Sequence, residues 1–156
     1  MTKEKSPDRL RLHALDPEDL ALVSALLQDA LLRIGDIAYL RDKKRFALVA
    51  ARFDWTAQAE GRLERCSTGL HFEAVRGVRY AGVARERPGE VLELLAILFK
   101  PGRTAPEGQV RLVFAGGPTI LLEVDCIEAQ VCDLSPRWGV SSCPAHELDE
   151  GAGAGS

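Results

Sequence analysis

The most constraining feature of this chain is a pair of segments, 109–114 and 119–124, in which apolar residues occupy every second position. The alternating residues are Val110, Leu112, Phe114, Ile120, Leu122 and Val124. A period of two is typical of strands that bury one face of a sheet. Gly116 and Gly117, between the segments, can adopt the positive φ angles of a tight hairpin. The sequence therefore predicts an antiparallel hairpin with one face in a core.

Further strands are predicted before this hairpin, and they are separated by glycine, proline and charged turns. The predicted strands cover residues 36–40, 45–53, 62–66, 70–75, 77–83 and 91–99. Segments 62–66 and 70–75 are expected to form a hairpin around residues 67–69. The segment 91–99 is apolar enough for either a helix or a strand, and the turn residues at both of its ends favour a strand.

Two helices are also predicted. Asp16 is a suitable N-cap, Pro17 fits the first helical position, and apolar residues at spacings of three and four continue to Ile34. Gly35 can supply the left-handed stop. After the hairpin, Asp125 can cap a short C-terminal helix with Glu128 completing a capping box.

These elements indicate an α+β fold with one domain, built mainly from an antiparallel sheet of seven or eight strands. An N-terminal helix and a short C-terminal helix complete it. Seven strands followed by a helix are also the order of a pleckstrin-homology-like barrel, which we keep as an alternative architecture.

The length of 156 residues fits one domain that buries a core without metal or disulfide crosslinks. We expect a globular domain over 10–145, a disordered N-terminus over 1–9 and a disordered tail over 146–156. No apolar segment has the pattern of a secretory signal or the length of a membrane span. Four cysteines without such a signal indicate reduced thiols and a cytoplasmic protein.

Charge is distributed unevenly along the chain. Residues 41–87 contain eleven Lys and Arg against six acidic residues, whereas residues 107–156 contain eight acidic residues against two Arg. The candidate surface for an anionic partner comprises Lys43, Lys44, Arg45, Arg62, Arg65, Arg76 and Arg79. Its neighbours in the segment Arg52-Phe53-Asp54-Trp55 include aromatic rings that can stack on bases, so RNA is a possible partner. The alternative is that the aromatic side chains close the core and acidic residues balance the arginines across the sheet.

Zinc ligands of the correct type occur near the C-terminus, at Cys126, Cys132, Cys143 and His146. Structural zinc sites usually begin with a closely spaced cysteine pair, whereas five residues separate Cys126 from Cys132. The two cysteines are better explained as small apolar residues of a docked helix. We therefore expect neither a metal nor another cofactor.

No catalytic motif is present. The chain has three histidines, and it contains neither a G-x-S-x-G nor a C-x-x-C motif. His71 alternates with Leu70 and Phe72, which predicts that it faces away from the apolar side of its strand. The glycines of GRTAPEG and AGGP match no phosphate-binding pattern. We expect a protein that is not an enzyme.

Several phrases of the chain resemble one bacterial family. They are LHALDPEDLALVSALLQDALLRIGDIAYL, KRFALVAARFDW, VLELLAILF and VFAGGPTILLEVDCIEA. With these phrases the chain resembles the alphaproteobacterial family called domain of unknown function 2948, over about Leu10 to Ala145. The resemblance implies a small bacterial cytosolic protein, and it implies no activity, cofactor or site residue.

Two classes of function follow from these patterns. The first is a binding module that engages a protein partner, or alternatively RNA through the basic central strands. The second is a small enzyme with an unrecognised site. A continuous apolar or basic surface would favour binding. A pocket in which His71 or a cysteine meets an acidic side chain would favour an enzyme.

Overall fold

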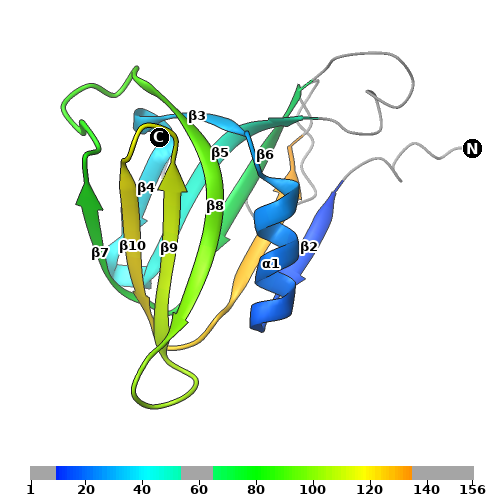
Figure 1. Cartoon of the computed structure of the whole chain (residues 1–156), viewed down its shortest axis with the longest axis vertical. Coiled ribbons are helices and arrows are strands. Elements are labelled where there is room, and N and C mark those ends of the chain that lie inside the picture. The colour runs from blue at the N-terminus through cyan, green and yellow to red at the C-terminus, as the bar shows by residue number, and fades with distance from the viewer. Residues whose placement is uncertain (1–9, 54–64, 135–156) are drawn as a thin grey trace, which may run out of the picture.

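The computed structural model describes residues 10–53 and 65–134, which form ten strands and one α-helix (Figure 1). The helix is α1 (Pro17–Leu26), and two short 3-10 helices are η2 (Ile34–Asp36) and η3 (Arg41–Lys43). The strands are β2 (Arg11–Ala14), β3 (Leu31–Arg33), β4 (Ile37–Leu40), β5 (Arg45–Phe53), β6 (Arg65–Phe72), β7 (Val75–Ala81), β8 (Val91–Pro101), β9 (Gly108–Phe114), β10 (Thr119–Val124) and β11 (Ala129–Asp133).

The strands form one open, antiparallel sheet in the order β2-β11-β6-β5-β3-β8-β9-β10-β7, and β4 also pairs with β5. The sheet bends back on itself, so that β7, β10, β9 and β8 form one layer in front of β4, β5 and β6 (Figure 1). Helix α1 packs beside β8 and β2. The mainly antiparallel sheet and the N-terminal helix are confirmed. The count of seven or eight strands is too low, and the pleckstrin-homology-like barrel is not confirmed.

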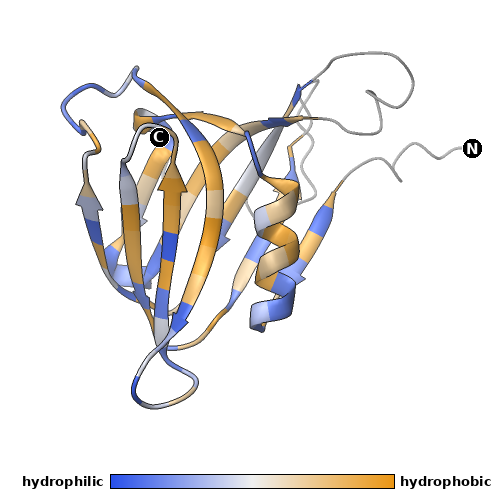
Figure 2. Cartoon of the chain, in the orientation of Figure 1, coloured by the Kyte–Doolittle hydropathy of each residue, from blue (hydrophilic) through white to orange (hydrophobic). Residues whose placement is uncertain are grey.

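The predicted hairpin is confirmed as β9 and β10. Leu112 pairs with Ile120 and Val110 pairs with Leu122, and these four side chains are fully buried. Gly116 and Gly117 in the turn have φ angles of 90° and 111°, as a tight hairpin requires. In Figure 2 polar bands interrupt the apolar colour along β9, because one of its faces meets solvent.

The predicted strands at 36–40, 45–53, 77–83 and 91–99 correspond to β4, β5, β7 and β8. The segment 91–99 is therefore a strand. Its apolar residues include Leu94 and Ile97, which are buried in the same core as Phe46 of β5 and Leu112 of β9.

The prediction that the N-terminal helix continues to Gly35 is wrong. Helix α1 ends at Leu26, and Asp29 adopts a left-handed φ of 69°. The chain then turns onto β8, where the Asp29 amide donates to the Leu94 carbonyl over 2.7 Å. The apolar residues 31–34 are spaced as if they were helical, but pairing with β8 and β5 makes Leu31–Arg33 a strand.

Three further expectations are wrong for a related reason. Residues 65–72 form one continuous strand, because β5 and β11 pair with it on both sides. The segment 129–133 is strand β11 and not a helix, because it lies between β2 and β6. Asp125 does not cap a helix; its amide donates to the Ala74 carbonyl over 2.9 Å. No strand was predicted at the position of β2.

None of the described helices is long and apolar enough to span a membrane. The expected disorder of residues 1–9 and 146–156 concerns positions outside the described part of the chain. The same is true of Asp54, Trp55, Arg62, Cys143 and His146.

Candidate functional site

The bend of the sheet brings β4 opposite β7. Among the described strands, β4 pairs only with β5 and β7 pairs only with β10, so the edges of β4 and β7 that face each other carry no ladder. We call the space between these two edges the seam cavity. Its volume is about 440 Å³, within the range of ligand-binding clefts.

The seam cavity is closed at both ends. At one end the Val75 amide donates to the Lys44 carbonyl and the Tyr39 hydroxyl donates to the Val75 carbonyl, each over 2.9 Å. At the other end the Gly35 amide donates to the Pro88 carbonyl over 2.8 Å. A Cβ atom at position 35 would lie 3.0 Å from Pro88, so glycine permits this close approach. Gly35 thus serves the cavity and does not stop a helix.

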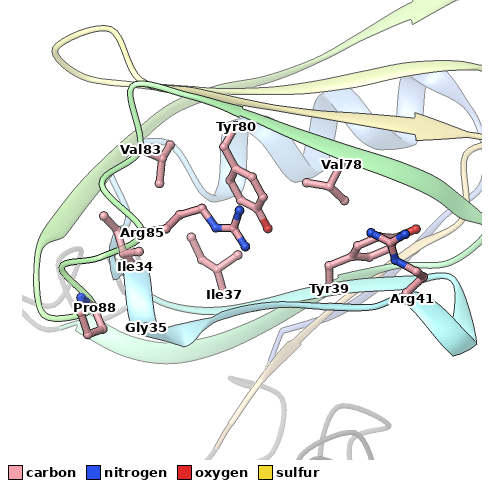
Figure 3. A pocket seen from close by; sticks show the side chains of 10 residues that line it. All are labelled: Ile34, Gly35, Ile37, Tyr39, Arg41, Val78, Tyr80, Val83, Arg85 and Pro88. Atoms are coloured by element: carbon pink, nitrogen blue, oxygen red, sulfur yellow. The ribbon is translucent and has the colours of Figure 1, made fainter.

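Ten residues line the seam cavity, and their side chains are shown in Figure 3. They are Ile34, Gly35, Ile37, Tyr39, Arg41, Val78, Tyr80, Val83, Arg85 and Pro88. Side chains alternate between the two faces of a strand. Ile37 and Tyr39 therefore share the face of β4 that lines the cavity, and Val78 and Tyr80 share the corresponding face of β7. The 3-10 helix after β4 and the loop after β7 then supply Arg41 and Arg85.

Both arginines of the seam cavity lie against aromatic rings. The Arg85 guanidinium carbon lies 4.2 Å from the centroid of the Tyr80 ring, and that of Arg41 lies 5.9 Å from the centroid of Tyr39. Within residues 10–53 and 65–134 neither arginine forms an ion pair with a carboxylate. Burial raises the pKa of Tyr80, and the charge of Arg85 opposes this shift. The Tyr80 hydroxyl therefore stays protonated at neutral pH and can donate a hydrogen bond.

The predicted basic surface is divided between acidic partners and separate places. Arg45 Nε lies 2.8 Å from Glu73 Oε2, without hydrogen-bond geometry. On β7, Arg76 lies 3.1 Å from Asp125 and Arg79 lies 3.0 Å from Glu123. These contacts match the alternative in which acidic residues balance the arginines of the sheet.

The other described members, Lys43, Lys44 and Arg65, lie at opposite ends of β5. Lys43 and Lys44 are exposed in the turn before β5, and Lys44 has a left-handed φ of 52°. Arg65 pairs with Phe53 at the far end, where its guanidinium carbon lies 4.0 Å from the centroid of the Phe53 ring. A strand of nine residues separates the two ends by roughly 26 Å. The structure therefore brings Lys43, Lys44 and Arg45 together and keeps Arg65 apart.

Arg52, which begins the aromatic segment, is a buried residue and not part of an exposed surface. It is 6% exposed, and its Nε and Nη2 atoms donate to the two carboxylate oxygens of Asp133 over 2.9 and 2.7 Å. Asp133 also accepts hydrogen bonds from the Thr68 hydroxyl and the Leu10 amide. We call these groups the Asp133 cluster. It joins β5, β6 and β11.

His71 meets an acidic side chain, as the enzyme alternative requires. Its Nδ1 atom lies 2.7 Å from Glu73 Oε2. His71 is only 6% exposed, although the alternation places it opposite Leu70 and Phe72. Neither His71 nor Glu73 lines the seam cavity. The pair therefore joins the end of β6 to the turn that follows it, and it is not part of the candidate site.

The cysteines form no metal centre within the described residues, which contain no group of three or more metal-ligating side chains. Cys126 is free, and its pKa is raised by partial burial and by Glu128 and Asp125. Cys132 is disulfide-bonded, which corrects the expectation of reduced thiols at this position.

Sequence reasoning did not single out Tyr39, Arg41, Tyr80 or Arg85. The spacing of Tyr39 from Ile37, and of Tyr80 from Val78, could have shown which side chains share a face. No local pattern indicates that β4 and β7 face each other, because neither strand pairs with the other. The site is therefore a product of the bend in the sheet.

Comparison with known proteins places the chain in a family. A family model described as a protein of unknown function, DUF2948, matches residues 10–146. No curated protein and no solved structure matches the chain. The family match covers most of the 156 residues and agrees with the resemblance carried by the sequence phrases. The chain belongs to the DUF2948 family.

Proposed function

We propose that this chain is a non-enzymatic binding module that engages a protein partner through the seam cavity. The observation that carries the proposal is the pair of arginines in the cavity, with Arg85 stacked on Tyr80 and Arg41 near the Tyr39 ring, beside a few aliphatic side chains. Tyrosine and arginine are the residue types that dominate the energy of protein–protein contacts, especially around a depression. Stacking also limits the side-chain entropy that each arginine would lose on binding.

The composition of the lining supports binding over catalysis. The ten lining residues include no Ser, Cys, His, Asp or Glu, so the cavity lacks the usual nucleophiles and the carboxylate or imidazole bases. The one acid–histidine pair among the described residues, His71 with Glu73, lies at the end of β6 and outside the cavity. A site made of arginine, tyrosine and aliphatic side chains can hold a partner, but it has few groups with which to move a proton.

A comparative pull-down tests the proposal. The tagged wild-type protein and the Arg41→Glu/Arg85→Glu variant would be cross-linked in native lysate, with and without nuclease. The matched control is Arg79→Glu, because Arg79 is also an exposed arginine on the β7 side of the molecule but does not line the cavity. We expect one or more proteins to be captured by the wild type and by Arg79→Glu, and to be lost from the cavity variant.

Two other results would contradict the proposal. Capture of the same proteins by all three forms would show that the partner does not use the seam cavity. Capture that disappears with nuclease would favour the RNA alternative. Thermal melts of the three forms would establish that each remains folded.

A further inference from the structure

We propose that the seam cavity recognises the C-terminal residue of its partner chain, binding the terminal carboxylate at Arg85 and an apolar side chain at Ile37 and Val78. This inference rests on the proposed function and specifies what part of the partner is bound. Three features of the cavity support it: its closed ends, its hydrogen-bonding groups and the aliphatic side chains beside Arg85.

The closed ends exclude a continuous strand. An added strand would have to run along β4 and β7 and leave at both ends. Contacts of Val75 with Lys44 at one end, and of Gly35 with Pro88 at the other, block that path. A chain terminus needs only one opening, so it can enter between the two strands.

Three side chains of the cavity, those of Arg41, Arg85 and Tyr80, are donors that form no hydrogen bond within the described residues. Arg41 and Arg85 carry donors only, and within the described residues no carboxylate pairs with them. The Tyr80 hydroxyl has no hydrogen bond within the same residues, and its raised pKa keeps the proton in place. Tyr39 differs, because its hydroxyl already donates to the Val75 carbonyl. The ligand group that complements this set is an oxyanion.

The position of Arg85 favours a planar carboxylate. Figure 3 shows its guanidinium between Tyr80 and Ile37, in the middle of the cavity. Stacking on Tyr80 uses the face of the guanidinium and leaves its N–H edge available. That edge matches the two oxygens of a carboxylate in a bidentate arrangement.

The rest of the cavity selects what the carboxylate is attached to. Ile37 and Val78 supply a small aliphatic surface next to Arg85, in a lining whose accessible surface is mostly polar. Part of a terminal Leu or Phe side chain would contact that surface. A terminal Lys would place a third cation beside Arg41 and Arg85, which is unfavourable.

The test uses immobilised octapeptide pools with randomised upstream positions. Each pool ends in Leu, Phe or Lys, as either the free acid or the amide. We expect the wild-type protein to be retained by the Leu and Phe free acids and to bind their amides roughly 10- to 100-fold more weakly, because a charge-assisted hydrogen bond is lost. Arg85→Gln should lose the preference for the free acid, whereas Arg79→Gln should keep it. Thermal melts would check the fold of both variants.

Equal retention of acid and amide pools, or no retention of any pool, would overturn the inference. If cavity-dependent capture of a partner in lysate persisted when that partner's C-terminus was amidated, the inference would fail and the proposed function would stand. N-acetylleucine serves as the small-molecule arm. Binding of N-acetylleucine at Arg85 without binding of any peptide would overturn both the inference and the proposed function, because the ligand would then be a free organic acid.

Discussion

Arg52 and Arg85 show how one residue type serves two purposes in this molecule. Arg52 is 6% exposed and donates to both oxygens of Asp133. Arg85 lies at an exposed position, and its guanidinium rests on the Tyr80 ring. A buried charge must be paired, so Arg52 is part of the structure of the sheet. A charge that solvent still reaches can remain unpaired until a ligand arrives.

The two regions also differ in how they join strands. The Asp133 carboxylate accepts hydrogen bonds from Arg52, Thr68 and Leu10, so it connects neighbouring strands that a ladder already pairs. In the seam cavity no ladder joins β4 to β7, and the backbone hydrogen bonds from Val75 to Lys44 and from Gly35 to Pro88 lie at its two ends. We therefore expect substitutions in the Asp133 cluster to affect stability and substitutions in the seam cavity to affect binding.

The largest effect is expected for Asp133→Ala. Removal of the carboxylate breaks its buried ion pair with the Arg52 guanidinium, which should lower the free energy of unfolding by about 3–5 kcal/mol. Urea denaturation followed by circular dichroism measures the change. The control Glu123→Ala breaks the exposed pair with Arg79 and should cost about 0–1 kcal/mol. Similar losses for both variants would contradict the distinction between buried and exposed pairs.

A second comparison uses two residues that pair across β10 and β7. Leu122 is fully buried, whereas its partner Val78 is only partly buried and lines the cavity. Leu122→Ala should cost about 2–5 kcal/mol through lost burial and the cavity left behind, and Phe114→Ala should cost a similar amount. Val78→Ala should cost less than about 1.5 kcal/mol, because it removes less buried apolar area. An equal loss at Leu122 and Val78 would show that the seam is part of the closed core.

Arg85→Ala tests the other side of the comparison. The variant loses only an exposed cation–π contact, so its stability should fall by no more than about 1 kcal/mol. Partner capture in lysate should nevertheless be lost. A melt as strongly shifted as that of Asp133→Ala would mean that Arg85 holds the fold together and that the seam cavity is not poised for a ligand.

The smallest effect concerns Tyr80 at alkaline pH. Its pKa is raised in the folded protein from the ordinary value of 10.0, mainly by burial. The neutral form therefore contributes stability below that value, and the contribution is lost as the pH rises through the folded-state pKa. Tyr80→Phe should reduce the loss of stability above this pH, as measured by urea denaturation across a pH series. An identical alkaline profile for the variant and the wild type would show that Tyr80 is as solvated as a free tyrosine.

Much of the sheet could be predicted because its strands alternate in hydropathy. The β9–β10 hairpin and β5 follow directly from a period of two, and the turn residues around 91–99 correctly favoured a strand. The failures occurred where local signals competed with pairing. Leu31 and Leu32 continue a helical spacing but pair in β3, and Asp125 and Glu128 resemble a helix cap but precede β11. Backbone pairing with two neighbouring strands outweighed these weak local preferences.

The candidate site was less predictable than the fold. Counting charges correctly found an excess of basic residues over 41–87, but it could not show that Arg45, Arg76 and Arg79 face carboxylates. The residues of the seam cavity were not distinguished, because Tyr39 and Tyr80 belong to strands that are distant in the sequence.

By itself, the sequence of this protein carried the resemblance to the DUF2948 family. It also determined the mainly antiparallel sheet, the N-terminal helix and the main hairpin with its buried face. These properties depend on hydropathy and turn chemistry, which act between residues close together in the chain. Only the tertiary structure decided where helix α1 ends, that residues 129–133 form a strand, and which arginines keep no acidic partner within the described residues. The physical reason is that each of these outcomes depends on contacts between segments far apart in the chain. Those contacts exist only once the sheet has bent and brought β4 to face β7.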